Sequence, residues 1–312
     1  MKEGQLKRIS KTEKMKKNQV MQCYLMIALP LIGFFVFILY PIFWTFRLSA
    51  FSYNGVASMT KFVGLDNFKT LFTTYFTYWK MWGNTLIFTV CKIPVELSLA
   101  MLLAVLLNGK LKGSSFFRSA YYLPNVVSVA IVGLVFSNLF SYYGIINAML
   151  AKLGLIKEGV EWFSTRGKAI TVVVTASIWN TFGVNVMYLL AALSNVPTEV
   201  YEAADLDGAK RFTKFFKITL PLIAPVFQTI LLLSILGTLG ANELIIVLTG
   251  GAPGGQTNTV MSYLTSQFVP GFFTSSSPAL GYGSAMSVIT TIIFAVVAIF
   301  YNKFSKKLSE MY

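Results

Sequence analysis

The sequence predicts an all-α polytopic membrane protein with six transmembrane helices, on the basis of three observations. Of its 312 residues, 55% are hydrophobic and only 12% are charged, whereas a soluble domain carries about 25% charged residues. Six segments contain apolar runs of about 20 residues, the length of a helix that crosses the hydrocarbon core of a bilayer. The net charge of +14 comes mainly from residues beside these segments, which indicates membrane topology and argues against nucleic acid as a partner.

The predicted spans divide the chain into an arm, one transmembrane domain and a tail. Residues 1–20 form a basic arm, residues 21–305 the transmembrane domain and residues 306–312 the tail. The spans cover residues 22–46, 84–107, 119–140, 167–193, 219–249 and 284–301. Pro30 and Pro41 predict kinks in the first span, because proline removes a backbone donor inside a helix.

The distribution of lysine and arginine predicts which side of the membrane each loop occupies. Six spans place both termini on one side, together with the turn at 108–118 and the loop at 194–218. These segments carry 17 lysines and arginines, whereas the three opposite loops with their flanking residues carry 8. Because cytoplasmic loops are enriched in positive charge, both termini and the 194–218 loop are predicted to be cytoplasmic.

The 194–218 loop is polar and charged, yet it has the sequence features of ordered helices. Residues 201–207 contain good helix formers, and Gly208 is suited to the turn that ends this segment. Residues 209–217 predict a second short, basic helix whose three phenylalanines are spaced to share one face. Pro221 fits the first turn of the next span, where its missing N–H costs little. Two short helices at a membrane surface are suited to docking on another protein.

The same loop resembles a known motif. It contains Glu202-Ala203-Ala204, then Gly208 after three residues, then Ile218-x-Leu220-Pro221 after nine more. This spacing matches the EAA loop of permease subunits of binding-protein-dependent ABC importers. Other phrases are typical of the maltose-transporter type of sugar permease in this family: FVGLDNF at 62–68, RSAYYLP at 118–124, LTGGAPGGQT at 248–257 and GYGSAMS at 281–287. The resemblance implies the type I ABC importer permease fold, with residues 21–305 as the permease domain.

The resemblance also implies partners and a motor outside this chain. In the family, the EAA loop forms coupling helices that dock into a cleft of a separate ATPase subunit, which binds ATP and Mg, so no cofactor or metal is expected here. The other expected partners are a second homologous permease subunit, a second ATPase subunit, an extracellular or periplasmic sugar-binding protein and a sugar or oligosaccharide, in a bacterial cell membrane. The expected coupling residues are Glu202, Ala203, Ala204, Asp207, Gly208, Ala209 and Phe212.

The sequence shows no energy source or catalytic centre of its own. A phosphate-binding loop needs Gly-Lys followed by Ser or Thr, whereas Gly-Lys occurs here only before Leu111 and Ala169. The chain contains no histidine, which removes the commonest metal ligand and the usual proton relay at neutral pH. We therefore predict a non-catalytic transport subunit that is driven by a partner or by an ion gradient.

Neutral polar residues form stripes along the fourth, fifth and sixth predicted spans. Residues four apart share one face of a helix, and inside a bilayer their polar groups need partners, either across helices or around a polar cavity. Both interpretations stay open for each single residue, while three stripes together favour a path for an uncharged, hydroxyl-rich solute. Glycines beside aromatic residues would leave room for sugar rings. The expected path residues are Asn180, Gly183, Asn185, Tyr188, Ser234, Thr238 and Asn242.

Three charged residues fall within the predicted spans. Lys92 and Glu96 lie one helical turn apart, which favours an internal ion pair over a role in transport. Glu243 lies near the outer end of the fifth span, where it lines the cavity, contacts a neighbouring subunit or is solvated. An ABC permease for amino acids or polyamines would need such a charge along the path. An ion-coupled carrier is a further alternative, but it leaves the EAA spacing unexplained.

Overall fold

The computed structural model describes residues 19–74, 76–109, 113–269 and 279–309. The predicted basic arm, up to residue 18, and the last three residues of the predicted tail lie outside these ranges. Within them, five helices are long and apolar enough to cross a membrane, and a bent pair of helices is the sixth candidate. The five are Gln19–Leu48, Thr77–Leu107, Arg166–Ser194, Arg211–Leu239 and Leu280–Lys307. The architecture is the all-α membrane fold that the composition predicts.

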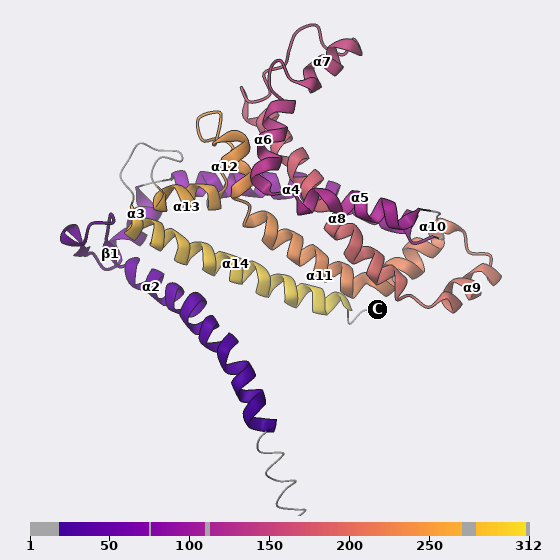
Figure 1. Ribbon diagram of the computed structural model, residues 1–312, viewed down its shortest axis with the longest axis horizontal. Helices are drawn as coiled ribbons and strands as arrows, with labels where there is room; N and C mark the ends of the chain where they lie inside the picture. The colour runs from indigo at the N-terminus through magenta and orange to yellow at the C-terminus, as the bar shows by residue number, and fades with distance from the viewer. Residues whose placement is uncertain (1–18, 75, 110–112, 270–278, 310–312) are drawn as a thin grey trace, which may run out of the picture.

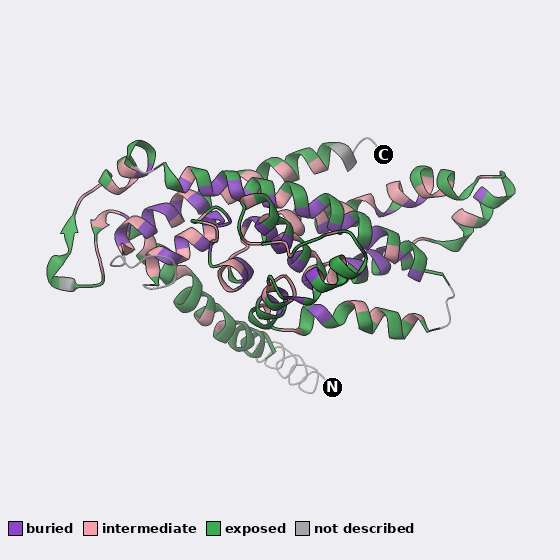
Figure 2. Cartoon of the chain, turned by 90° about the horizontal axis from the view of Figure 1, so that it is seen from above, coloured by how far each residue is buried: buried purple, intermediate pink, exposed green. Residues whose placement is uncertain are grey.

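The long helices lie side by side along the long axis of the molecule (Figure 1). α4 (Thr77–Leu107) packs against α8 (Arg166–Ser194) and α11 (Leu220–Leu239), and α11 packs against α14 (Leu280–Ser309). The first helix runs obliquely to this bundle and contacts α14 through its last part, α2 (Tyr40–Leu48). Figure 2 shows that buried residues concentrate in the bundle, whereas the first helix is largely exposed.

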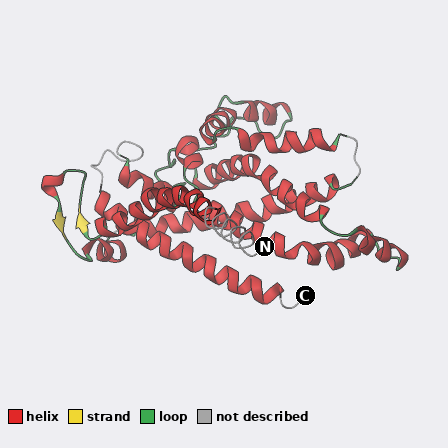
Figure 3. Cartoon of the chain, turned by 60° about the horizontal axis from the view of Figure 1, so that its bottom comes forward, coloured by secondary structure: helices red, strands yellow, loops and turns green. Residues whose placement is uncertain are grey.

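Short elements cover one end of the bundle (Figure 3). β1 (Phe51–Ser52) and β2 (Lys61–Phe62) form an antiparallel pair, with a 3-10 turn at Ala57–Met59 between them. α3 (Asp66–Thr73) packs against α14, and α13 (Val260–Phe268) packs against both α14 and α4. The 194–218 loop and the end of α14 lie at the opposite end of the bundle. The molecule therefore has two distinct ends, as a protein that crosses a membrane requires.

Among the predicted spans that are single helices in the structure, the limits differ from the prediction mainly at α4 and α14. α4 begins at Thr77 rather than at residue 84, because Tyr78 and Trp82 pack in a buried cluster with α13 and α14 beyond the most apolar stretch. α14 continues to Ser309, so the predicted tail begins inside a helix. Its last turn carries Lys306 and Lys307, where positive charge stabilises the C-terminal end of a helix.

Two prolines each follow a π-helical turn, which keeps the helix continuous through the proline. The turns are Phe35–Leu39 before Pro41 and Phe215–Thr219 before Pro221. In both, the residue before the proline donates its N–H to the carbonyl five residues earlier. This wider turn makes space for the proline ring, which otherwise clashes with the carbonyl four residues before it.

The sequence predicts a separate short helix over residues 209–217. In the structure, this segment is instead the beginning of a longer helix. α10 (Arg211–Lys214) continues through the π-helical turn into α11, so that one helix runs from Arg211 to Leu239. The 194–218 loop is thus joined to the bundle through a continuous helix.

The third predicted span, 119–140, is not one straight helix but two. α5 (Ser114–Val126) and α6 (Val129–Leu139) meet at an angle of 94°. The two residues between them are extended, with ψ angles of 133° and 134°. Near this end of α5, the carbonyl of Pro124 accepts a hydrogen bond from the Asn180 side chain of α8, at 2.8 Å. A side chain of another helix thus satisfies a carbonyl beside the break.

The fifth predicted span, 219–249, is also broken. α11 ends at Leu239, and α12 (Glu243–Thr249) begins after three non-helical residues. The Asn242 backbone has φ −139° and ψ −66°, outside the helical region. α6 and α12 pack against each other and against α8. α6 and α12, which follow the two breaks, therefore form one layer at the side of the bundle. α7 (Ile145–Lys152) extends from this layer (Figure 1).

Three buried clusters fill the space between the helices. The first joins α4, α8 and α11 near the 194–218 loop and contains Leu97, Leu189 and Ile223. The second joins α4, α6, α8 and α12, and the third joins α3, α4, α11, α13 and α14. α4 contributes to all three clusters, and α8 and α11 contribute to two each, so these three helices form the centre of the bundle.

Candidate functional site

The 194–218 loop forms a compact projection that its own side chains hold together. α9 (Thr198–Leu206) ends before Gly208, whose φ of +71° lies in the left-handed region that favours glycine. Asp205 of α9 forms an ion pair with Lys214 of α10. The Tyr201 hydroxyl lies 3.0 Å from Oγ1 of Thr219, which joins α9 to the π-helical turn. The predicted turn at Gly208 is present, and it brings the two helical segments into contact.

Most of the expected coupling residues are exposed on this projection, while two face inward. Ala204 is buried and Ala209 is half-buried. The exposed ones are Glu202, Ala203, Asp207, Gly208 and Phe212. Their exposure gives the loop a surface of mixed charge and apolar character, on which a partner can bind.

Leu206 also belongs to this surface, although it is not among the coupling residues predicted from the sequence. Its side chain is 90% exposed, and that of Phe212 is 80% exposed. Large apolar side chains on a projecting loop are typical of a protein–protein contact. The sequence signal is a leucine between two aspartates in a polar helix.

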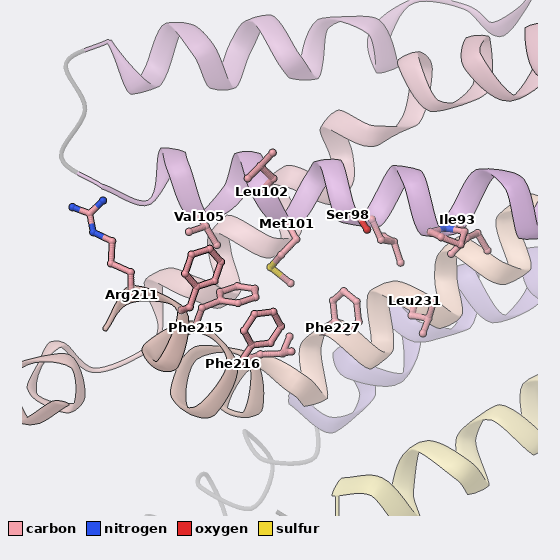
Figure 4. Close-up of a pocket in the computed structure, with 14 residues that line it drawn as sticks. Ile93, Ser98, Met101, Leu102, Val105, Arg211, Phe215, Phe216, Phe227 and Leu231 are labelled. Carbon is pink, nitrogen blue, oxygen red and sulfur yellow. The ribbon is translucent and has the colours of Figure 1, made fainter. Parts of the chain in front are cut away.

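An apolar groove connects this projection to the bundle (Figure 4). It has a volume of about 760 Å³ and lies between α4 and the helix that begins at Arg211. Met101 and Val105 line it from α4, and Phe215 and Phe216 line it from the π-helical turn. Arg211 lies at the end nearest the loop. The π-helical turn thus faces both the loop and α4.

A buried polar network joins α4, α8 and α11, and it consists of Lys92, Glu96, Thr181, Asn185 and Thr238. The Lys92 ammonium lies 3.4 Å from Oε2 of Glu96, so the predicted ion pair is present. Oε1 of Glu96 accepts hydrogen bonds from the Thr181 hydroxyl at 2.6 Å and from the Asn185 amide at 2.9 Å. Lys92 also donates to Oγ1 of Thr238 at 3.4 Å.

The seven expected path residues do not line one surface. Asn185 and Thr238 come together through the buried polar network. Ser234 is half-buried on α11, and Tyr188 is 49% exposed on α8. Asn242 does not share the face of Ser234 and Thr238, because the break after Leu239 changes its direction; its amide donates to Thr265 of α13 at 2.9 Å.

Asn180 and Gly183 face α5 and serve close helix packing. A Cβ atom at Gly183 would lie 1.8 Å from the carbonyl oxygen of Tyr121 and 2.7 Å from its carbonyl carbon. Gly183 therefore does not leave room for a sugar ring, so the expectation from the sequence is wrong at this position. It allows the α5 backbone to approach α8, and the neighbouring Asn180 bond to Pro124 needs this approach.

Glu243 lies in the first turn of α12 and is exposed. A carboxylate at this position is favoured by the positive end of the helix dipole. Glu243 thus stabilises the start of α12. The sequence does not predict this helix start, because it predicts an unbroken fifth span.

A second set of polar contacts, which the sequence does not predict, fixes the end of the bundle away from the 194–218 loop. Asn84 of α4 accepts a hydrogen bond from the Arg166 guanidinium at 2.6 Å and donates to the Asn258 carbonyl at 2.9 Å. The neighbouring Thr85 hydroxyl accepts from the Val260 N–H at 2.9 Å. These bonds tie α4, α8 and the start of α13 together.

We expect Asn84→Leu to lower the free energy of unfolding by about 1–3 kcal/mol, because it leaves buried polar groups of two other segments without their partner. Thermal unfolding of the purified chain in detergent measures the change. Asn138→Leu is the matched control, since Asn138 is exposed and its side-chain amide donates to the Leu134 carbonyl, one turn earlier in the same helix. Equal unfolding temperatures for both variants would contradict the role of Asn84.

Comparisons with known proteins agree with this geometry. The family described as "Binding-protein-dependent transport system inner membrane component" matches residues 20–310. The arabinooligosaccharides transport system permease protein AraP of Bacillus subtilis is 34% identical over 286 residues, which cover 90% of this chain and 88% of AraP. The trehalose/maltose transport system permease protein MalF of Thermococcus litoralis is 32% identical over 293 residues, 94% of this chain and 96% of MalF.

The fold is similar to that of a solved transporter. It superposes with a TM-score of 0.80 on a chain of the bacterial alginate ABC transporter, crystallised in complex with an alginate pentasaccharide-bound periplasmic protein. The superposition covers 95% of this chain and 97% of that chain, at 22% sequence identity. The arrangement of helices is therefore that of an ABC importer permease.

Proposed function

Because this chain belongs to the family of binding-protein-dependent transport system inner membrane components, we propose that it is a permease subunit of an ATP-driven carbohydrate importer. It is a multi-pass membrane protein that forms half of the translocation pathway and couples that pathway to a separate ATPase. The observation that carries the coupling role is the projecting 194–218 loop. Its exposed Glu202, Leu206 and Phe212 are held on a loop that continues as one helix into the bundle.

Carbohydrate is the substrate class that the relatives and the buried groups favour. Curated relatives with 34% and 32% identity are permeases of arabinooligosaccharide and of trehalose/maltose transport systems. A charged solute would need an opposite charge along the path. Lys92 is paired with Glu96, and Glu243 lies exposed at the start of α12. The buried polar groups thus suit a neutral, hydroxyl-rich substrate better than an amino acid or a polyamine.

The family supports a set of partners for this chain. A second homologous permease completes the pathway, two ATPase subunits bind the 194–218 loops, and a sugar-binding protein delivers the substrate from outside. ATP and Mg bind to the ATPase, so this subunit itself is not catalytic. The loop and both termini lie on the cytoplasmic side of a bacterial cell membrane, where ATP is present and where positive charge is enriched.

The mechanism is alternating access driven from the loop. When the ATPase dimer closes, the bound loops move with it, and the continuous helix from Arg211 to Leu239 transmits this movement to α4 and α8. The two breaks allow the segments on either side to change their angle without bending a straight helix. The path then opens to the outside, and the neutral polar groups bind the sugar briefly.

The direct test is uptake by the complete complex in proteoliposomes, with a panel of neutral sugars and oligosaccharides. We expect uptake of at least one of them to require ATP on the ATPase side and the binding protein on the other side. Uptake of a charged amino acid or polyamine, with none of any sugar, would contradict the carbohydrate assignment.

Ser234→Phe tests the path on α11. We expect sugar uptake to fall about tenfold or more, since a ring at a half-buried path position costs on the order of 1–3 kcal/mol, while basal ATP hydrolysis by the complex persists. Thr229→Phe is the control, because Thr229 is exposed on the same helix. Unchanged uptake by Ser234→Phe would remove this residue from the path.

A further inference from the structure

The buried polar network places two opposite charges at the centre of the bundle. Glu96 is 1% exposed and Lys92 is 6% exposed. A buried ion pair loses hydration on both sides, and two apolar side chains of the same size often stabilise a fold as well or better. Stability alone therefore does not account for charges at this position.

The network lies between the two apolar clusters of the central helices. On α4, Phe88 belongs to the cluster with α6 and α12, and Ile93 and Leu97 belong to the cluster near the 194–218 loop. Lys92 and Glu96 therefore occupy the boundary between the half of the bundle that contacts the broken segments and the half that contacts the loop.

The network also lies at the level of both helix breaks. Thr238 is the residue before Leu239, where α11 ends. On α8, Thr181 directly follows Asn180, which bonds to Pro124 beside the break between α5 and α6. Glu96 thus fixes α8 next to one break, and Lys92 contacts α11 next to the other.

We propose that Lys92 and Glu96 are positioning residues of the transport pathway, which hold Asn185 on α8 and Thr238 on α11 in the geometry that receives the sugar. The two charges act on different helices, because Glu96 orients the Asn185 amide and Lys92 orients the Thr238 hydroxyl. The two charges neutralise each other, so the site they arrange selects a neutral solute. This inference rests on the proposed function, because it assigns a role within the same pathway.

Two double variants separate positioning from packing. The Lys92→Met, Glu96→Leu double variant removes the ammonium that bonds to Thr238 and the carboxylate that bonds to Asn185, and it leaves no unpaired charge. Lys92→Met with Glu96→Gln keeps a carbonyl oxygen that accepts from Thr181 and Asn185 but loses the donor to Thr238. Both variants are reconstituted as complete complexes, and uptake of the sugar that the wild-type complex transports best is measured against its concentration.

We expect the KM for uptake to rise about tenfold in the Lys92→Met, Glu96→Leu variant, the scale of one or two lost hydrogen bonds. The rise is about threefold in the Lys92→Met, Glu96→Gln variant, because the restored acceptor rescues Asn185.

A wild-type KM in the Lys92→Met, Glu96→Leu variant would overturn the proposal, as would a lowered maximal rate with unchanged KM. If that variant does not assemble, the Lys92→Met, Glu96→Gln variant decides: a raised KM supports the proposal and a wild-type KM overturns it. Failure of the proposed function is distinguishable, because the wild-type complex would then import no sugar at all.

Discussion

Glu202→Lys is expected to abolish ATP-driven sugar uptake while the protein still inserts into the membrane. Glu202 is exposed on α9, so its replacement removes no contact that holds the loop together; those contacts come from Tyr201, Asp205 and Lys214. A reversed charge at the centre of a protein–protein contact costs on the order of 2–5 kcal/mol of binding free energy. That cost weakens the binding of the ATPase about thirtyfold or more.

Co-purification measures this effect directly. The ATPase that purifies with the wild-type chain should be lost from Glu202→Lys, and sugar-stimulated ATP hydrolysis should disappear with it. Glu158→Lys is the matched control, because Glu158 is an exposed glutamate in the segment between α7 and α8. In Figure 1, α7 lies far from α9 and α10 of the 194–218 loop. Normal uptake by Glu202→Lys would remove the coupling role from this residue.

Gly183→Ala is expected to prevent correct packing of α5 on α8. The new Cβ would lie 1.8 Å from the carbonyl oxygen of Tyr121, and backbone atoms cannot turn aside as a side chain can. The helices must separate, which also breaks the bond from Asn180 to Pro124. The cost therefore exceeds the about 1–3 kcal/mol that is typical of overpacking.

The yield of folded protein in detergent and its unfolding temperature measure the loss at Gly183. Gly237→Ala is the control, since apart from its chain neighbours and the nearby backbone of its own helix, no atom of the described residues lies within 4 Å of the position that its Cβ would take. In a helix, alanine instead of glycine stabilises by about 0.5–1 kcal/mol, so this variant should unfold at the same temperature or higher. Equal behaviour of the two variants would refute the close approach of α5 to Gly183.

The 194–218 loop and the helix that follows it could largely be predicted from the sequence. The spacing of Glu202, Gly208 and Pro221 predicts a helix, a turn and a further helix, and the structure has this order. The spacing does not reveal that the second helix continues into α11. Helix continuity depends on the π-helical turn before Pro221, whereas a proline at this position fits the first turn of a new helix equally well.

The two helix breaks could not be predicted from hydropathy. A hydropathy pattern averages over about 20 residues, so the short segments 127–128 and 240–242 do not interrupt the apolar runs that contain them. The breaks depend on tertiary contacts, in which Asn180 and Thr265 bond to groups beside them. For the same reason, the stripe that the sequence predicts through Asn242 is interrupted in the structure.

Small and polar residues in membrane spans are compatible with a solute path and with close contacts between helices. Only the packing of the helices distinguishes the two. Gly183 fits a sugar path as well as a close helix contact until the position of Tyr121 is known. The Lys92 and Glu96 pair is predictable because both partners lie on one helix, four residues apart. Their bonds to α8 and α11 are not, since these partners lie far away in the chain.

The proposed role of this chain is that of a gate moved by an ATPase that binds its 194–218 loop. It is tested by reconstituting the permease pair in proteoliposomes, with the binding protein and sugar outside, and with or without the ATPase and ATP inside. Sugar is expected to accumulate above its external concentration only when both ATPase and ATP are present. Sustained accumulation by the permease pair alone, driven by an ion gradient, would contradict it.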